Sequence, residues 1–157
     1  MSHRLSSKFL IVAGMLFTGI AYAGTAEAVI AIIHDFPIFG VVNGTQTARI
    51  NAVLLPYLEQ APPCPVTLAF FDSQGNQLGG PDTFELRGGA AVHSSFIGDP
   101  GIRILQRLQI RAQVTIGDPG LFPGCAGAVL TSVEVVDKIT RATHLILTNP
   151  VTREIAR

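Results

Sequence analysis

Apolar residues at every second position constrain the fold of this chain more than any other feature of its sequence. In residues 47–54 every even-numbered position carries Ala, Ile or Leu, and in residues 107–116 the even positions are again apolar. Such a pattern is typical of a strand with one buried face. No segment keeps the 3.6-residue apolar period of a helix. With turn residues recurring about every eight to twelve positions, the sequence predicts an all-β fold: an antiparallel two-sheet β-sandwich of immunoglobulin-like architecture with about eight or nine strands.

The sequence Gly-Asp-Pro-Gly occurs twice, at residues 98–101 and 117–120. Proline fixes φ at the second turn position, aspartate accepts hydrogen bonds from turn amides, and glycine relieves the exit from the turn. The stretch between the two copies is longer than most strands. We therefore expect a bulge or break near Leu105 and Gln106.

Two further turns follow from local chemistry. Gly88 and Gly89 supply the positive φ of a hairpin turn, which predicts pairing between residues 83–87 and 90–96. Residues 43–45, Asn-Gly-Thr, match the N-glycosylation pattern, but we interpret them as a turn.

The first 23 residues have the three zones of an export signal. Two basic residues precede an uncharged run of twelve residues at 9–20, and Ala-Tyr-Ala at 21–23 provides a small-residue cleavage site. A second such site, Ala-Glu-Ala, lies at 26–28. Because the apolar run is shorter than the roughly 20 residues of a membrane span, we predict a cleaved signal peptide over residues 1–23 and no membrane association after cleavage.

The remaining chain divides into three parts. Residues 24–37 form a lead-in or an extra strand, because they include the apolar run 29–33. Residues 38–148 contain the predicted sandwich. Residues 149–157 are interpreted as a polar C-terminal tail.

The chain has two cysteines, Cys64 and Cys125. In an oxidising compartment two cysteines most simply pair. Two buried thiols, or two metal ligands, are the alternatives, but no third or fourth ligand lies at a usable spacing. The sequence therefore predicts a Cys64–Cys125 disulfide that joins the two layers of the sandwich.

Charge argues against two classes of partner. The leader holds two of the eleven basic residues and none of the eleven acidic ones, so nine basic and eleven acidic residues remain. This slightly acidic balance gives no reason to expect binding to nucleic acid or to an anionic membrane.

Several segments resemble a known group of proteins: FGVVN (39–43), ARIN (48–51), CPVTLAFFD (64–72), QIRA (109–112) and VEVVD (133–137). The chain resembles small exported bacterial β-sandwich proteins of unknown function over residues 38–148. The resemblance implies export and fold, and it implies no chemistry. That group usually has Thr-Gly in its last hairpin turn, where this chain has Thr140 and Arg141.

Candidate catalytic and metal-binding residues are few. After the leader there are three histidines, His34, His93 and His144, and no two have the spacing that brings metal ligands together. His93 and Ser95 share one side of a strand, which we interpret as a polar outer face. Aspartates concentrate in turns, where they cap amides. We therefore predict no enzyme activity, no catalytic residue, no metal site and no cofactor.

The strongest candidate binding surface is a row of planar, multi-donor side chains on one strand face: Arg107, Gln109, Arg111 and Gln113, followed by Thr115. Alternate strand residues project to one side, about 6.6 Å apart. Such a row suits sugars or acidic polymers, although a solvated strand face would have the same composition.

These observations lead to three hypotheses of function. The first is an exported, non-catalytic structural or interaction module in the periplasm, at the cell surface or outside the cell, whose partner is unknown and could be another exported protein. The second is a module that binds a glycan or polymer through the strand face at residues 107–115. The third is a small enzyme or metal carrier.

Overall fold

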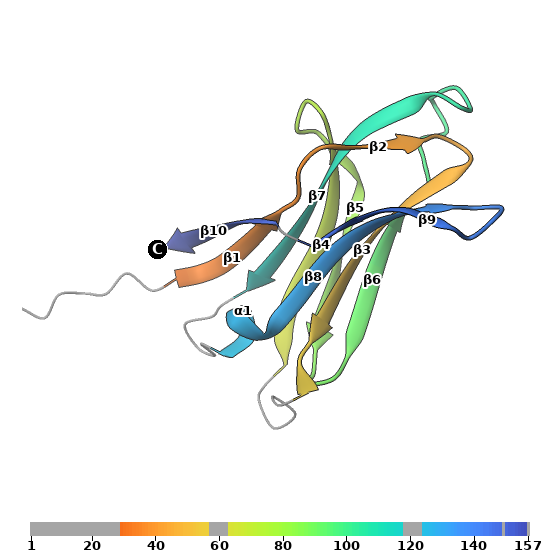
Figure 1. Ribbon diagram of the computed structural model, residues 1–157. Coiled ribbons are helices and arrows are strands. Elements are labelled where there is room, and N and C mark those ends of the chain that lie inside the picture. The colour runs from red at the N-terminus through yellow and green to blue at the C-terminus, as the bar shows by residue number, and fades with distance from the viewer. Residues whose placement is uncertain (1–28, 57–62, 118–123, 149, 157) are drawn as a thin grey trace, which may run out of the picture.

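The computed structural model of the chain describes residues 29–56, 63–117, 124–148 and 150–156. These residues form ten strands and one short helix (Figure 1). In chain order the elements are β1 (Val29–Asp35), β2 (Phe39–Val42), β3 (Gln46–Leu54), β4 (Cys64–Asp72), β5 (Gln77–Leu86), β6 (Ala91–Phe96), β7 (Arg107–Gly117), α1 (Gly124–Ala128), β8 (Val129–Asp137), β9 (Thr143–Leu147) and β10 (Val151–Ala156).

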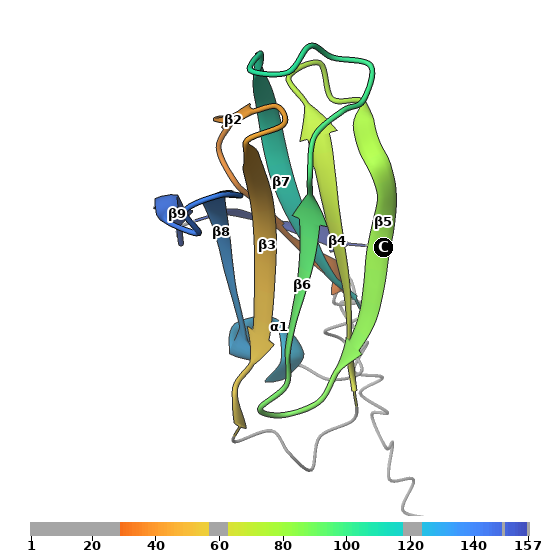
Figure 2. The ribbon, with the colours of Figure 1, turned by 90° about the vertical axis from the view of Figure 1, so that its right-hand side faces the viewer.

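The strands form two antiparallel sheets packed face to face, which confirms the predicted β-sandwich (Figures 1 and 2). Sheet A has the order β10-β1-β7-β4-β5, and β2 also pairs with β7. Sheet B has the order β6-β3-β8-β9. The long strand β7 is central to sheet A, because β4 lines one of its edges while β1 and β2 share the other.

The two-residue period is confirmed in both strands where it was clearest. In β3 and β7 the even-numbered residues from 48 to 54 and from 108 to 116 are buried between the sheets. Together with residues of β2, β4 and β8 they form one hydrophobic core that includes Phe36, Phe39, Leu68 and Phe70. Burial of these side chains is the main favourable term for folding.

The disulfide links Cys64 and Cys125, with a Cα–Cα distance of 5.8 Å. Cys64 is the first residue of β4 in sheet A, and Cys125 lies in helix α1, which continues directly into β8 of sheet B. The bond therefore joins a strand to a helix turn at one end of the sandwich, and through α1 it ties the two sheets together.

The hairpin predicted at Gly88 and Gly89 is wrong in its pairing, although the turn is present. Gly89 has a φ of 78°, but β5 belongs to sheet A and β6 to sheet B. The turn is bound to β3 instead: Gly89 N donates to Leu54 O at 2.8 Å, and Leu54 N donates to Ala90 O at 3.0 Å. These bonds direct the chain into sheet B, so β5 and β6 lie side by side without forming a ladder (Figure 2).

The break expected near Leu105 and Gln106 is present, and β7 begins only at Arg107. Leu105 has a φ of 69°. Its N–H donates to Asn43 O at 2.9 Å, while Asn43 N donates to Gln106 O at 2.9 Å. Asn43 lies in the turn predicted at 43–45. The break is therefore held by backbone bonds to this turn.

Asn43 holds the same loop through its side chain, which is buried. Its Nδ2 donates to Asp99 O at 3.0 Å and to Ile102 O at 2.8 Å, while its Oδ1 accepts from Asp99 N at 3.1 Å. The amide thus satisfies polar groups of the loop that would otherwise be left without partners at this end of the core.

Both terminal segments differ from a simple lead-in and tail. The run at 29–33 lies in β1, the extra strand. The segment expected as a polar tail contains β10, which pairs with β1 from Asp35↔Val151 to Val29↔Ala156. The tail prediction failed because β10 is an exposed edge strand, whose side chains need no apolar alternation. The predicted signal peptide over residues 1–23 lies outside the described residues, and of the second Gly-Asp-Pro-Gly turn only Gly117 is described.

Candidate binding face

The predicted row occupies the middle of the outer face of sheet A. Arg107 and Gln109 are exposed, Arg111, Gln113 and Thr115 are half-buried, and the residues between them face the core. Because β7 is a central strand, the row is flanked by side chains of its neighbours on both sides. We name this surface, residues Arg107, Gln109, Arg111, Gln113 and Thr115 of β7, the β7 face.

Arg111 is positioned by an aromatic ring of the neighbouring strand. Phe71 of β4 lies directly opposite Arg111 in the ladder, and the Arg111 Cζ atom lies 5.2 Å from the centre of the Phe71 ring. A guanidinium over an aromatic face is attracted by the ring quadrupole and loses side-chain freedom before any ligand arrives. Sequence reasoning missed Phe71: the β4 alternation shows which face it is on, but not which β7 residue lies opposite.

Gln113 belongs to a short polar chain that reaches the sheet edge. Its Nε2 donates to Asp35 Oδ1 at 2.8 Å, and Arg153 Nε donates to Asp35 Oδ2 at 2.6 Å. Asp35 is thereby neutralised by an ion pair with Arg153. The sequence does not predict either contact, because Arg153 falls in the expected tail and Asp35 in the expected lead-in.

Arg107 does not lie with the other polar side chains of the β7 face. Its guanidinium crosses diagonally over Gly40 of β2, where a Cβ atom would lie within 2.7 Å of Arg107 Cζ. Arg107 and Arg111 therefore project from the same face of β7 into different surroundings.

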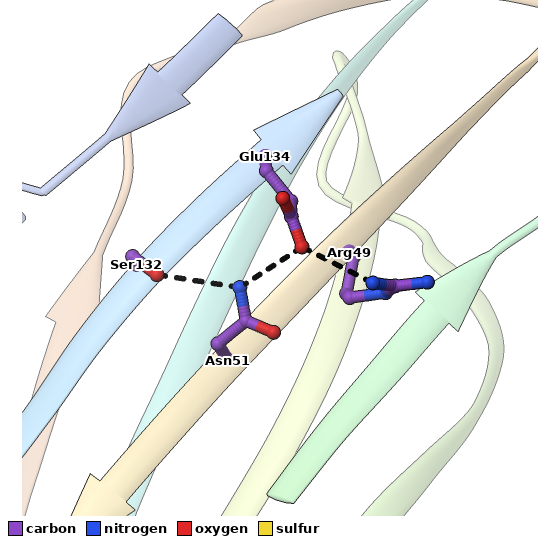
Figure 3. A network of polar contacts seen from close by, with 4 residues as sticks. All are labelled: Arg49, Asn51, Ser132 and Glu134. Carbon is purple, nitrogen blue, oxygen red and sulfur yellow. Dashed lines mark hydrogen bonds and ion pairs between the residues drawn. The ribbon is translucent and has the colours of Figure 1, made fainter. Parts of the chain in front are cut away.

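The outer face of sheet B carries a second polar cluster (Figure 3). Glu134 Oε1 accepts hydrogen bonds from Arg49 at 3.3 Å and from Asn51 at 3.4 Å, and Asn51 Nδ2 also donates to Ser132 Oγ at 3.3 Å. These contacts connect β3 and β8 across the sheet. Since the Glu134 carboxylate accepts from two donors, we interpret the cluster as cross-strand contacts that stabilise sheet B.

The histidines do not converge. His34 Nδ1 lies 3.0 Å from Thr131 Oγ1 between the sheets, and burial lowers the pKa of His34. Its neighbour Asp35 faces the opposite side of the strand. His93 and His144 are exposed in β6 and β9. Among the described residues, no three His, Cys, Asp or Glu side chains are grouped closely enough to hold a metal ion.

His93 and Ser95 share the exposed side of β6, as predicted from the alternation, and Ser94 between them is buried. Their ladder partners on β3 are Asn51 and Arg49. His93 and Ser95 thus border the cluster that contains Glu134.

The turn aspartates cap amides as expected. Asp72 accepts from Gln74 N and Asn76 N, each at 2.8 Å, and its pKa is lowered mainly by the side-chain amide of Asn76. Asp137 accepts from Thr140 N at 2.7 Å and Ile139 N at 2.8 Å, and these bonds lower its pKa. Asp99 accepts from Gly101 N at 2.8 Å. These carboxylates serve turns rather than a shared site.

Comparisons with protein families, with curated proteins and with solved structures found no match for the chain. In the part of the chain that the structure describes, no helix has the length and apolar character to cross a bilayer. The disulfide is compatible with a compartment outside the cytoplasm, where such bonds persist.

Proposed function

We propose that the chain is an exported, non-catalytic β-sandwich module that binds an acidic polymer, such as a uronate-rich glycan, through the β7 face. The observation that carries the proposal is the stacking of Arg111 on Phe71 in the middle of an otherwise polar row. The ring holds a cation in place on an open sheet surface, where a carboxylate of an extended ligand can reach it.

Three further features support this assignment. Gln109 and Gln113 flank Arg111 at the strand repeat, so donors and acceptors follow one another along a line suited to a chain ligand. Asp35 is paired with Arg153 and does not oppose an incoming anion with an unpaired charge. The predicted leader and the disulfide support placement outside the cytoplasm, where such polymers occur.

Affinity chromatography on immobilised polygalacturonate tests the proposal. The protein, expressed from its full coding sequence and purified, is expected to be retained and to elute with salt, because surface charge contacts are screened. The double variant Arg107→Ala and Arg111→Ala is expected to bind about tenfold more weakly, since it loses charge-assisted hydrogen bonds.

The matched control is Arg87→Ala with Arg103→Ala, which removes the same charge from two exposed positions outside the β7 face. This control should elute with the wild type. Passage of the wild-type protein straight through the column, or equal losses for both double variants, would refute a specific role for the β7 face.

A further inference from the structure

Strands β2 and β9 lie on the side of the sandwich opposite β5 (Figure 2). Residues of both strands line a groove there. Its volume is about 510 Å³, within the usual range of small-molecule sites. The side chains that line it are mostly apolar and include Ile38, Phe39, Val42, Val135, Leu145 and Leu147.

The groove is open because β2 ends sheet A there. Among the described strands β2 pairs only with β7, and β9 pairs only with β8. Val42 N–H points away from β7, where Gln46 Oε1 accepts it at 2.9 Å. By the alternation of backbone groups along a strand, the N–H of Gly40 points to the same side, into the groove.

Arg107 and His144 are among the lining residues, and of the described residues no carboxylate lines the groove. The Arg107 guanidinium reaches this position by crossing Gly40, where any larger residue would meet it. Among the described residues, Arg107 has no carboxylate within ion-pair distance. The groove thus combines a mostly apolar lining with the positive charge of Arg107.

We propose that this groove binds a small amphipathic carboxylate, with its apolar chain against Phe39, Leu145 and Leu147 and its acid group at Arg107 and the Gly40 amide. A guanidinium next to a backbone N–H offers donors to both oxygens of one carboxylate. The apolar lining suits a short hydrocarbon chain and not a polyanion. The groove shares Arg107 with the β7 face but does not include Arg111, so the proposal does not rest on the proposed function.

Calorimetric titration with decanoate tests the proposal on protein expressed from its full coding sequence. Decanoate should bind with a saturable one-to-one isotherm. Acetate lacks the hydrocarbon chain, and decan-1-ol lacks the charge. Each should bind at least about tenfold more weakly, because acetate loses the apolar contacts and decan-1-ol loses the charged contact with Arg107.

Two variants test the role of Arg107. Arg107→Gln removes the charge from an exposed position, and Gly40→Ala keeps the charge but displaces the guanidinium; each should weaken decanoate binding by about tenfold. The matched control for the second variant is Gly80→Ala, because a methyl group there meets no atom within 4 Å. Circular dichroism checks that each variant is folded. If Gly40→Ala does not fold, the affinity of Arg107→Gln for decanoate decides the question.

Three results would overturn the proposal: no binding of decanoate by the wild type, equal affinity for decan-1-ol, or unchanged affinity in Arg107→Gln. Arg111→Ala separates the two proposed sites. It should leave decanoate binding unchanged, and a loss equal to that of Arg107→Gln would place the acid on the β7 face and so refute the groove.

Discussion

Two arginines four residues apart on one strand face show how strongly neighbours determine the role of a side chain. Arg111 meets the ring of Phe71 on β4, whereas Arg107 crosses Gly40 on β2. The alternation in β7 is the same at both positions. Their different surroundings come entirely from the strands that pair with β7 on either side.

His34 makes stability depend on pH near neutrality. Burial lowers its pKa from 6.5, so between that value and the lower folded one the unfolded chain binds more protons than the folded chain. Stability from this residue is complete above about pH 6.5 and is lost as the pH falls toward the folded pKa. We expect the free energy of unfolding, measured with urea, to fall between about pH 7.5 and 5, and the fall to be smaller in His34→Gln.

Thr131→Val provides the control for His34. It removes the hydroxyl partner of Nδ1 but leaves the histidine buried. Because burial is the cause of the shift, this variant should keep the pH dependence of the wild type. If His34→Gln shows the same slope as the wild type, another group is responsible. Asp72 and Asp137 do not interfere, since their lowered pKa values act below about pH 4.

At the level of elements, β10 covers an edge that would otherwise be open. It pairs with β1 over nearly the full length of both strands. A chain that ends at Asn149 should therefore expose the backbone edge of β1, which is a template for pairing with another chain. We expect a lower melting temperature and concentration-dependent association, measured by analytical ultracentrifugation.

Arg153→Ala separates the strand from its ion pair. This variant keeps β10 and removes only the contact with Asp35. Its free energy of unfolding should therefore fall by less than about 1 kcal/mol, and it should sediment as a single species at the same concentrations as the wild type. If the truncated chain has the melting temperature of the full chain and associates no more than it does, β10 does not protect the edge.

The strands were predictable from sequence to the extent that their own side chains alternate. The buried faces of β3 and β7 follow from Ile50 and Ile110 and their even-numbered neighbours. Pairing was not predictable in the same way, because the partner of a strand depends on contacts distant in sequence. Gly89 marks a turn correctly, but only its bond to Leu54 shows that the chain changes sheets there.

For the candidate sites, too, the face of a single strand was predictable and the contacts between strands were not. Arg107 to Gln113 could be placed on one outer face from the period alone. Phe71, Asp35 and Gly40 give that face its local chemistry, and they come from three other strands. No pattern within β7 encodes its register against those strands, so the groove beside β2 could not be predicted.

At the scale of the whole molecule, the disulfide closes a loop with a sequence separation of 61 residues. The chain-entropy model assigns about 4 kcal/mol to a loop of this size. We expect Cys64→Ala with Cys125→Ala to lower the free energy of unfolding by up to that amount, measured with urea. Wild-type protein in a thiol reductant should lose a similar amount, and the double variant should not respond to the reductant. Equal stability in all these samples would contradict the assigned role of the bond.

The turn between β2 and β3, which contains Asn43, lies at the end of the sandwich opposite α1 (Figures 1 and 2). One extremity of the molecule is thus fastened covalently and the other by an amide that no reductant can cleave. Loss of the sulfur linkage would consequently loosen the molecule asymmetrically. Amide protons near α1 would exchange with solvent sooner, while those around Asn43 would retain their protection.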